Sequence, residues 1–371
     1  MSFFSEYNVV FKLLKEKQQV VFYSESRHYY QYFEKLIQDL LNNGIEICYI
    51  TSDPKDPLLT TAPEKMKVIR VKLLLGFLFS KLKADVMIMT MPDLGNYLFK
   101  RSPEVGTYIY MFHAAVSTHQ QYRKAAFFSY DTIFCTGEYQ QKEIQKAEEL
   151  YVLRTKDIIP YGYPLLDKIK RSVAEVSNKN ESKQTLLIAP SWFDGCIFDT
   201  CIQELLQELS KLPYKVVLRS HPEFEKRKKK IFKSIQQLIK QYPGMEIDEL
   251  PNVFERLQST DILITDRSGI AFEFAFGIQK PVLFINTNLK INNPDYQELE
   301  IEPIENSLRY EMGVSVSPDN LEQIKDKLTE LQTMSVGFVQ KMESLSSEIF
   351  YNSESTYQAG LGYIISKLRN D

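Results

Sequence analysis

The sequence predicts an α/β protein with two doubly wound, Rossmann-like halves, each a mostly parallel sheet covered by helices on both faces. Short apolar runs alternate with helical patterns twice, first between residues 19 and 137 and again between 185 and 286. A polar, charged stretch that ends near residue 184 separates the two series. The length of 371 residues, about twice that of a typical domain, agrees with two domains.

The first half begins its alternation at residue 19. The run "QVVFYSES" is typical of a buried strand, a helix follows to about Asn43, and Gly44 ends that helix before the next strand. The further elements predicted in this half are strands at 45–52, 66–71, 84–90, 106–114 and 130–137 and a helix at 73–83. Short buried strands that alternate with helices favour a parallel sheet.

The second half repeats the alternation after the linker. Its predicted elements are strands at 185–191, 214–220, 245–250, 261–266 and 281–286, a helix at 201–212, a basic helix after 222, and a helix from about 270. We place an N-terminal domain at 1–175, a C-terminal domain at 183–335, and helices at 336–371 that can cross back to the first domain. Two such domains are expected to face a central cleft at the carboxyl ends of their strands.

Composition excludes several classes of protein. The net charge of -3 gives no general reason to expect nucleic-acid binding. The four cysteines form no CxxC pair, so neither a zinc site nor a disulfide framework is expected, and no acidic cluster that would require a metal is evident. The start lacks the apolar core of a signal peptide, and no apolar run is long enough to span a bilayer. A cytoplasmic location is therefore predicted, with no cofactor.

Histidines lie at or just after predicted strand ends, where open α/β sheets bind their ligands. His113 follows "TYIYMF", and His221 follows "YKVVLRS". His119 comes six residues after His113 and is expected to bind substrate by positioning the acceptor or the donor. Arg219 and His221 are two residues apart, so both side chains can point the same way. A guanidinium beside an imidazole suits the oxygens of a diphosphate. The alternatives are that these histidines are structural and that Arg219 pairs with a neighbouring acid.

The stretch "TDRSG" leads from a strand into a helix and predicts a phosphate site. Helix N-termini expose unpaired N–H groups, Ser268 adds a hydroxyl, and Gly269 lets the backbone approach closely. Glu273, about one turn into the helix, would repel phosphate and is expected to bind ligand hydroxyls instead. The alternative is that these residues only cap the helix. The candidate ligand-binding residues here are Thr265, Asp266, Arg267, Ser268, Gly269 and Glu273.

Two further loops are candidates. The loop "APSWFDG" holds Trp192, the only tryptophan, which is placed either to stack on a base or to fill a domain interface. In "IPYGYPLLD", Gly162, Tyr163 and Pro164 are expected to shape a turn near the cleft.

These landmarks, in this order, resemble the CDP-glycerol glycerophosphotransferase family of teichoic-acid primases, polymerases and capsule-making relatives. The family's "APTWRD", "RLHP" and "TDYSSxxFDFA" are similar to "APSWFD", "RSHP" and "TDRSGIAFEFA" here. Its "KPxxFY" resembles Lys280-Pro281 to Phe284, its "GYPRxD" resembles Gly162-Tyr163-Pro164 with Asp167, and its strand-end "HGTPLK" is matched at His113 only. The resemblance covers roughly residues 105 to 290.

The resemblance implies the GT-B architecture and transfer of glycerol phosphate or ribitol phosphate from a CDP-alcohol to an acceptor hydroxyl, releasing CMP. It places His113 and His221 in the catalytic set, the first as general base and the second, with Ser268, as a diphosphate ligand. Glu273 replaces an aspartate that contacts the donor. "HGTPLK" has lost its Gly, Pro and Lys, one Ser of "YSS" is Gly269, and the Arg of "GYPR" is Leu165. These departures indicate a divergent member and bear on the identity of the donor.

Two other functions fit the same residues. One is a GT-B glycosyltransferase or epimerase that uses a nucleotide-sugar, because the phosphate site would serve either donor. The other is a nucleotide-binding module without catalysis. The expected partners for the favoured function are a CDP-alcohol and a polymer or lipid-linked acceptor of the cell envelope.

Residues 67–85 predict peripheral contact with the cytoplasmic face of a membrane. The apolar core "LLLGFLF" is too short to span a bilayer and is flanked by Lys67, Arg70, Lys72, Lys81 and Lys83. Such a segment can lie among anionic headgroups. The alternative is a buried helix of the first domain.

Overall fold

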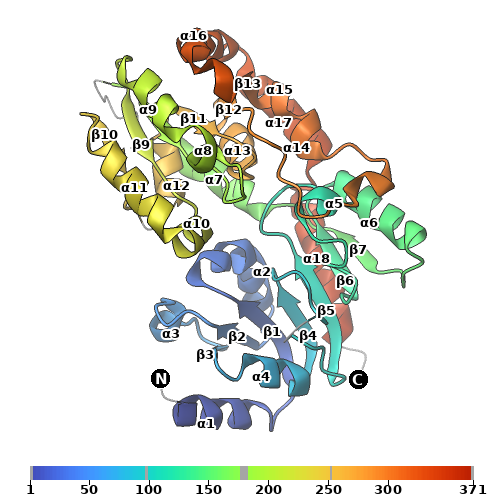
Figure 1. Cartoon of the computed structure of the whole chain (residues 1–371). Coiled ribbons are helices and arrows are strands. Elements are labelled where there is room, and N and C mark those ends of the chain that lie inside the picture. The colour runs from blue at the N-terminus through green and yellow to red at the C-terminus, as the bar shows by residue number, and fades with distance from the viewer. Residues whose placement is uncertain (1–2, 97–98, 176–182, 251–252, 369–371) are drawn as a thin grey trace. The chain divides into compact units, whose positions relative to one another are not determined.

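The computed structural model describes residues 3–96, 99–175, 183–250 and 253–368 and contains two parallel β-sheets (Figure 1). The described chain divides into two compact units. The first comprises residues 1–165, 292–301 and 349–371, and the second comprises 166–291 and 302–348.

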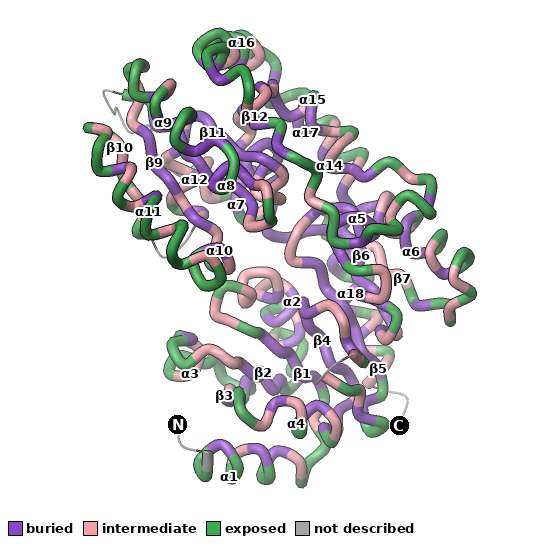
Figure 2. Tube along the Cα trace, in the orientation of Figure 1, coloured by how far each residue is buried: buried purple, intermediate pink, exposed green. Residues whose placement is uncertain are grey.

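The sheet of the first unit has the strand order β3-β2-β1-β4-β5-β6-β7, and every pair is parallel. The apolar runs form these strands because both faces of the sheet are covered, and Figure 2 shows the strands largely buried. The strands are β1 (Gln18–Ser24), β2 (Ile47–Thr51), β3 (Met66–Arg70), β4 (Ala84–Met89), β5 (Val105–Met111), β6 (Thr132–Cys135) and β7 (Asp157–Pro160).

The longer helices of the first unit are amphipathic. In α2 (Tyr30–Asn42) the buried side chains recur at helical spacing: Phe33, Leu36, Ile37 and Leu40. The helix ends before Gly44, whose φ of 78° is easily reached only by glycine. The other helices are α1 (Phe3–Leu13), α3 (Leu58–Thr61), α4 (Leu75–Lys81), α5 (Thr118–Gln121), α6 (Glu138–Leu150) and α18 (Glu354–Leu368).

The last helix, α18, packs against β4, β7 and α2 (red in Figure 1). Tyr357, Leu361 and Ile364 join the core of the first sheet. Gly360 lies so close to Tyr161 that a Cβ there would be 2.4 Å from the ring. The chain therefore completes its first core with its last helix.

The sheet of the second unit has the order β10-β9-β8-β11-β12-β13, again with parallel pairs only. Its strands are β8 (Thr185–Ile188), β9 (Lys215–Leu218), β10 (Met245–Ile247), β11 (Ile262–Thr265), β12 (Val282–Ile285) and β13 (Gly313–Val316). Its helices are α7 (Pro164–Glu175, which begins in the first unit), α8 (Ile197–Thr200), α9 (Ile202–Ser210), α10 (Pro222–Arg227), α11 (Lys229–Ile239), α12 (Val253–Gln258), α13 (Ile270–Phe272), α14 (Ile304–Ser307), α15 (Arg309–Met312), α16 (Ile324–Met334) and α17 (Phe338–Ile349).

Two parallel, doubly wound sheets confirm the predicted fold class, with three local differences. The strands β7 and β13 were not predicted, because neither is a continuous apolar run: β7 begins with an exposed Asp157 and is only partly buried, and β13 contains Gly313 and a half-buried Ser315. The basic helix is two helices, α10 and α11, separated at Lys228. The predicted linker lies largely at 176–182, outside the described residues.

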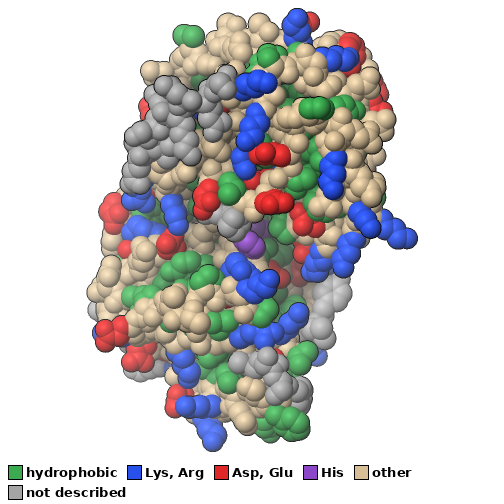
Figure 3. All heavy atoms as spheres, turned by 90° about the vertical axis from the view of Figure 1, so that its left-hand side faces the viewer, with side chains coloured by type: hydrophobic (Ala, Val, Ile, Leu, Met, Phe, Trp, Pro, Cys, Tyr) green, Lys and Arg blue, Asp and Glu red, His purple; other side chains and the backbone are tan. Residues whose placement is uncertain are grey.

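The structure also bears on surface charge, membrane-spanning helices and metal-ion sites. On the face drawn in Figure 3, basic side chains are interspersed with acidic ones. Among the described helices, none has both the length and the apolar composition to cross a bilayer. No group of three or more described His, Cys, Asp and Glu side chains is placed to hold a metal ion.

Candidate active site

In the second unit, the candidate loops meet where the strand order reverses. The sheet runs outward from the neighbouring strands β8 and β11 in opposite directions. The loop "APSWFDG" follows β8, and "DRSG" follows β11. Such a reversal opens a crevice at the carboxyl ends of the strands, where doubly wound sheets bind ligands.

Asp266 holds these two loops together. Its buried carboxylate accepts hydrogen bonds from the backbone N–H of Ser191 (2.8 Å), Ile197 (3.0 Å) and Arg267 (2.6 Å). The buried Thr265 hydroxyl donates to the carbonyl of Ala189 at 2.7 Å. Asp266 and Thr265 were predicted to bind substrate, but their polar atoms bind the protein. Their role in this structure is to shape the crevice.

His221 begins helix α10, and its hydrogen bonding defines which ring nitrogen carries the proton. Its Nδ1 accepts from the backbone N–H of Glu223 at 3.1 Å. In the neutral ring the proton must therefore be on Nε2. His221 can therefore donate a hydrogen bond from Nε2 to a phosphate oxygen. Because Nε2 already carries a proton in the neutral ring, this nitrogen is not suited to act as a general base.

Trp192 lies beside His221 within the second unit. The two rings have centroids 6.0 Å apart, and the Arg227 guanidinium is 5.1 Å from the indole ring. The indole is only partly buried, so one side of this cluster remains accessible. Trp192 is therefore held near the carboxyl ends of β8 and β9, as stacking on a base would require.

Arg219 makes the ion pair that the sequence left open as an alternative. Its Nη1 binds the buried carboxylate of Asp248 and donates to the carbonyl of Leu250 at 3.0 Å. Arg256 Nε also binds Asp248, at 2.8 Å. Strand parity could predict the direction of the Arg219 side chain but not that Asp248 is its partner. In this structure the guanidinium of Arg219 binds protein groups.

The turn after β11 leaves a hydroxyl available. Within the described residues, the Ser268 side chain makes no hydrogen bond, and it is not fully buried. Gly269 has an ordinary helical φ of −61°, so no special backbone conformation requires a glycine there. The predicted helix begins at Ile270, but after one turn it continues as a π-helix, Glu273–Ile278. Glu273, at the start of the π-helix, is buried. Such π segments recur at functional sites.

Positive charge gathers beside this turn. Arg309 is buried and donates to the carbonyls of Asp266 (2.7 Å) and Ile285 (3.2 Å) and to Asn286 Oδ1 (3.0 Å). Burial, followed by repulsion from Arg267, lowers the pKa of Arg309 to about 9. All of these acceptors are neutral, so the Arg309 charge is offset only at longer range, by Asp266. Arg309 lies outside every motif, so it could not be identified from the sequence.

Arg267 adds an unused donor to the same place. Its Nη2 donates to the carbonyl of Thr287 at 3.3 Å, and burial lowers its pKa. Arg267 Nε and Thr287 Oγ1 are both buried and have no hydrogen-bond partner among the described residues. Buried polar atoms are seldom left unpaired, so these two are expected to be satisfied by a ligand or by water.

In the first unit, His113 is enclosed by aromatic rings. It follows β5 and lies 5.4 Å from Tyr29, 6.1 Å from Tyr32 and 6.2 Å from Tyr122, measured between ring centroids. The Tyr163 hydroxyl donates to the His113 carbonyl at 3.2 Å. The histidine is half-buried, so its position is fixed while part of it stays accessible.

The turn at Gly162 and Tyr163 fixes this aromatic enclosure. Asn352 accepts from the Tyr163 N–H at 2.6 Å and donates to the Tyr163 carbonyl at 2.9 Å. Gly162 has a φ of 92°, and a Cβ there would lie 2.6 Å from Asn352 Oδ1. Tyr163 stacks on Tyr32, so the turn supports the ring next to His113. Gly162 and Tyr163 thus position other residues in this structure.

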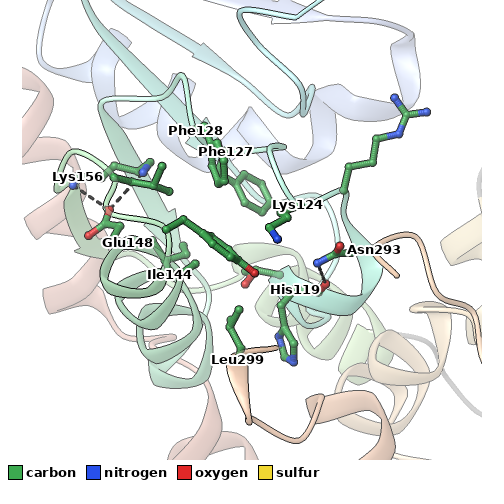
Figure 4. Close-up of a pocket in the computed structure, with 14 residues that line it drawn as sticks. His119, Lys124, Phe127, Phe128, Ile144, Glu148, Lys156, Asn293 and Leu299 are labelled. Atoms are coloured by element: carbon green, nitrogen blue, oxygen red, sulfur yellow. Dashed lines mark hydrogen bonds and ion pairs between the residues drawn. The ribbon is translucent and has the colours of Figure 1, made fainter. Parts of the chain in front are cut away.

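His119 lies in a different environment from His113. Its buried ring lies in the wall of a pocket (Figure 4). The ring Nε2 is 2.9 Å from the carbonyl of Ile301, and Nδ1 is 3.3 Å from Glu143 Oε1. Asn293 Nδ2 donates to the His119 carbonyl at 3.0 Å. Lys124 Nζ pairs at 2.8 Å with Glu298, which lies in the segment 292–301 together with Asn293 and Ile301. His119 therefore anchors residues 292–301 to α5 and α6, a role the sequence did not suggest.

A family model of CDP-glycerol:poly(glycerophosphate) glycerophosphotransferases matches residues 5–293. The teichoic acid glycerol-phosphate primase of Bacillus subtilis (strain 168) is 26% identical over 174 residues, which are 44% of this chain and 41% of that protein. The match thus spans about two fifths of the length of this relative.

Solved structures share the fold over nearly the whole chain. The wall teichoic acid polymerase TagF has a TM-score of 0.57 at 14% identity, covering 99% of this chain and 98% of that one. A UDP complex of MnaA from S. aureus has a TM-score of 0.62 at 13% identity, covering 95% and 98%. UDP-GlcNAc 2-epimerase from Neisseria meningitidis has a TM-score of 0.57 at 14% identity, covering 96% and 100%. The GT-B-like fold class is therefore confirmed.

Proposed function

Because the chain belongs to the CDP-glycerol:poly(glycerophosphate) glycerophosphotransferase family, we propose that it transfers glycerol phosphate, or a similar polyol phosphate, from a CDP-alcohol to an acceptor hydroxyl. The acceptor would be a cell-surface glycan or a lipid-linked precursor of one, and CMP would be released. The observation that carries the proposal is the group of donors at the ends of β8, β9 and β11. Together they suit a diphosphate.

The reaction exchanges one phosphorus–oxygen bond for another. The acceptor oxygen attacks the phosphorus that bears the polyol, and the bond from that phosphorus to the CMP oxygen breaks. The electron pair of the broken bond leaves on CMP, and the acceptor proton passes to a base. Negative charge grows on the CMP side, so catalysis needs hydrogen-bond donors and positive charge there.

The second unit supplies those groups in the proposal. His221 Nε2 and the Ser268 hydroxyl donate to diphosphate oxygens, and the unpaired donors of Arg267 and Thr287 face the same ligand. The buried Arg309 guanidinium binds the Asp266 carbonyl and contributes positive charge near the ligand without contacting it. Trp192 offers a surface for the cytosine, and Glu273 is proposed to bind hydroxyls of the donor.

His113 is the proposed base. An imidazole has an ordinary pKa of about 6.5, so near neutral pH it can accept the proton of a hydroxyl. The surrounding tyrosine rings fix its orientation, which keeps the distance to an acceptor oxygen reproducible. His119 is proposed to act only through the structure around it, because both its ring nitrogens face protein groups.

A donor panel tests the proposal. Purified protein is incubated with CDP-glycerol, CDP-ribitol and several UDP- and GDP-sugars, and nucleotide release is measured. CMP release from CDP-alcohols alone is expected. Turnover of a nucleotide-sugar would favour the glycosyltransferase or epimerase alternative, and absence of cytidine-nucleotide binding in calorimetry would refute the donor site.

Ser268→Ala tests the phosphate contact. Loss of one hydrogen bond to a charged ligand should weaken CDP-glycerol binding by about 1–2 kcal/mol. Ser210→Ala is the matched control, because that hydroxyl bonds only a carbonyl of its own helix end at an exposed site. Equal affinities for wild type and Ser268→Ala would place the diphosphate elsewhere.

Peripheral contact with the cytoplasmic membrane face is also part of the proposal. A lipid-linked acceptor would lie at that surface, so an enzyme that uses it has to reach the bilayer.

A further inference from the structure

The first unit exposes large apolar side chains on two neighbouring helices. Phe4 and Leu73 are 79% and 66% exposed, and Tyr7, Phe11 and Phe77 are also exposed. We call these five residues, on α1 and in or just before α4, the α1–α4 aromatic surface. Single exposed apolar residues are common in soluble proteins, but a group of them marks an interaction site.

Tyr7, Phe11 and Phe77 are in direct contact and join α1 to α4. The ring centroids of Tyr7 and Phe11 are 4.1 Å apart, and those of Phe11 and Phe77 are 5.7 Å apart. A buried carboxylate joins the two helices, because Glu6 Oε1 accepts from the backbone N–H of Lys72 (2.9 Å) and Leu74 (2.7 Å). The surface is therefore built into the fold.

Each helix also has a separate inward face. In α1, Glu6, Val10 and Leu13 are buried, and in α4 the buried residues are Leu75, Leu78 and Phe79. Phe77 and Lys81 are exposed and spaced four apart in α4, which places them on one line along the helix, and the exposed Leu73 lies just before it. The core is thus complete without the outward aromatic residues.

Lysines in and beside α1 and α4 have no acidic partner among the described residues. Lys12, Lys15, Lys72 and Lys81 are exposed and form no ion pair with any described residue. Other lysines of this unit are neutralised, for example Lys83, which pairs with Glu104 at 3.1 Å. Apolar side chains edged by unpaired cations match the two layers of an anionic membrane surface, acyl chains below and charged headgroups above.

We propose that the α1–α4 aromatic surface is the membrane-contact site, with its apolar side chains at the acyl–headgroup boundary and its lysines among anionic headgroups. This rests on the proposed function only in that a lipid-linked acceptor requires a membrane. The site differs from that predicted from residues 67–85 alone. Leu75, Leu78 and Phe79 of that apolar run belong to the core, and α1, which the sequence did not suggest, completes the site.

Vesicle sedimentation tests the proposal. The full-length protein is mixed with phosphatidylcholine vesicles, with or without phosphatidylglycerol, at low and high salt. We expect pelleting with the anionic vesicles at low salt. The variant Lys72→Gln/Lys81→Gln should weaken this binding by about fivefold per lysine. Phe4→Ser/Phe77→Ser should reduce binding at both salt concentrations.

Matched controls exclude general effects of charge and apolarity. Val152→Ser removes a side chain that is 91% exposed elsewhere in the first unit. Lys229→Gln/Lys230→Gln removes two exposed, unpaired lysines from α11. Both controls should pellet as the wild type does. Thermal melting of every variant checks that these exposed substitutions leave the fold intact.

Three outcomes would overturn the proposal: no pelleting of wild type with anionic vesicles, equal pelleting of the surface variants, or loss of pelleting in the α11 control. If ultracentrifugation shows that the wild type dimerises through these residues, and the protein does not bind vesicles, the surface is an interface with a second copy of the chain. CMP release without vesicles should be unchanged in the surface variants. That measurement separates failure of the membrane site from failure of the transferase proposal.

Discussion

The hydrogen bond at His221 Nδ1 allows the two ends of one imidazole to be tested separately. Nδ1 caps helix α10 by accepting from Glu223 N–H, whereas Nε2 is the donor proposed to reach the diphosphate. An asparagine places its amide oxygen near Nδ1, so His221→Asn should keep the cap and remove the donor. A glutamine places its amide near Nε2, so His221→Gln should keep a donor and lose the cap.

The expected magnitudes differ between stability and rate. Losing the cap removes one backbone-to-side-chain hydrogen bond, about 1 kcal/mol of unfolding free energy. Losing a donor to the developing charge lowers kcat by about 10²- to 10³-fold. His221→Asn should therefore be as stable as wild type but nearly inactive. His221→Gln should be about 1 kcal/mol less stable yet more active than the asparagine variant, and His221→Ala should show both losses.

Urea unfolding gives the stability of each variant, and CMP release from CDP-glycerol gives kcat. The reasoning fails if His221→Asn turns over at the wild-type rate. It also fails if activity follows stability across the three variants, because the histidine would then act only as a helix cap.

Four other substitutions give three independent tests. His113→Ala should lower transfer by roughly 10²- to 10⁴-fold with little change in CDP-glycerol affinity, as loss of a base would; unchanged turnover would remove it from the mechanism. Gly360→Ala should destabilise by about 1–3 kcal/mol because its Cβ meets a tyrosine ring. In the same helix Gly362→Ala, which meets nothing, should stabilise by up to about 1 kcal/mol in urea unfolding. Burial alone would raise the pKa of Asp53, but hydrogen bonds from Arg27 and the backbone outweigh it and lower the pKa to about 2. The folded state therefore holds this proton less tightly than the unfolded chain, so the pair stabilises above about pH 4 and its contribution disappears as the pH falls towards 2. Asp53→Asn should cost about 1 kcal/mol at pH 7 and less at pH 3; an equal loss at both would contradict the ion-pair account.

Strand-end chemistry could be predicted from sequence because it depends on local pattern. Apolar runs define where β5, β9 and β11 end, and the residues that follow them, including His113, His221 and Ser268, are placed by the direction of the strand. The loop with Trp192 could be predicted in the same way because it follows the end of a strand, β8, which in this sheet neighbours β11.

Partners that come from distant parts of the chain could not be predicted. Asp248, which pairs with Arg219, and Asn352, which fixes Tyr163, lie in segments without a motif. Arg309 reaches the end of β11 from a short helix beyond β12. Periodicity says which face of an element a side chain occupies, but not which remote residue will meet it there.

Residues 292–301 and helix α18 count with the first unit although the chain reaches them through the second. Neither unit is therefore one continuous piece of polypeptide. A fragment that stops at residue 165 would expose the sheet surface that α18 covers and would leave His119 without the Ile301 carbonyl. Expression of the two halves as separate fragments should yield aggregation-prone material, and a first half suited to isolated study would need residues 349–371 joined to it by a designed linker.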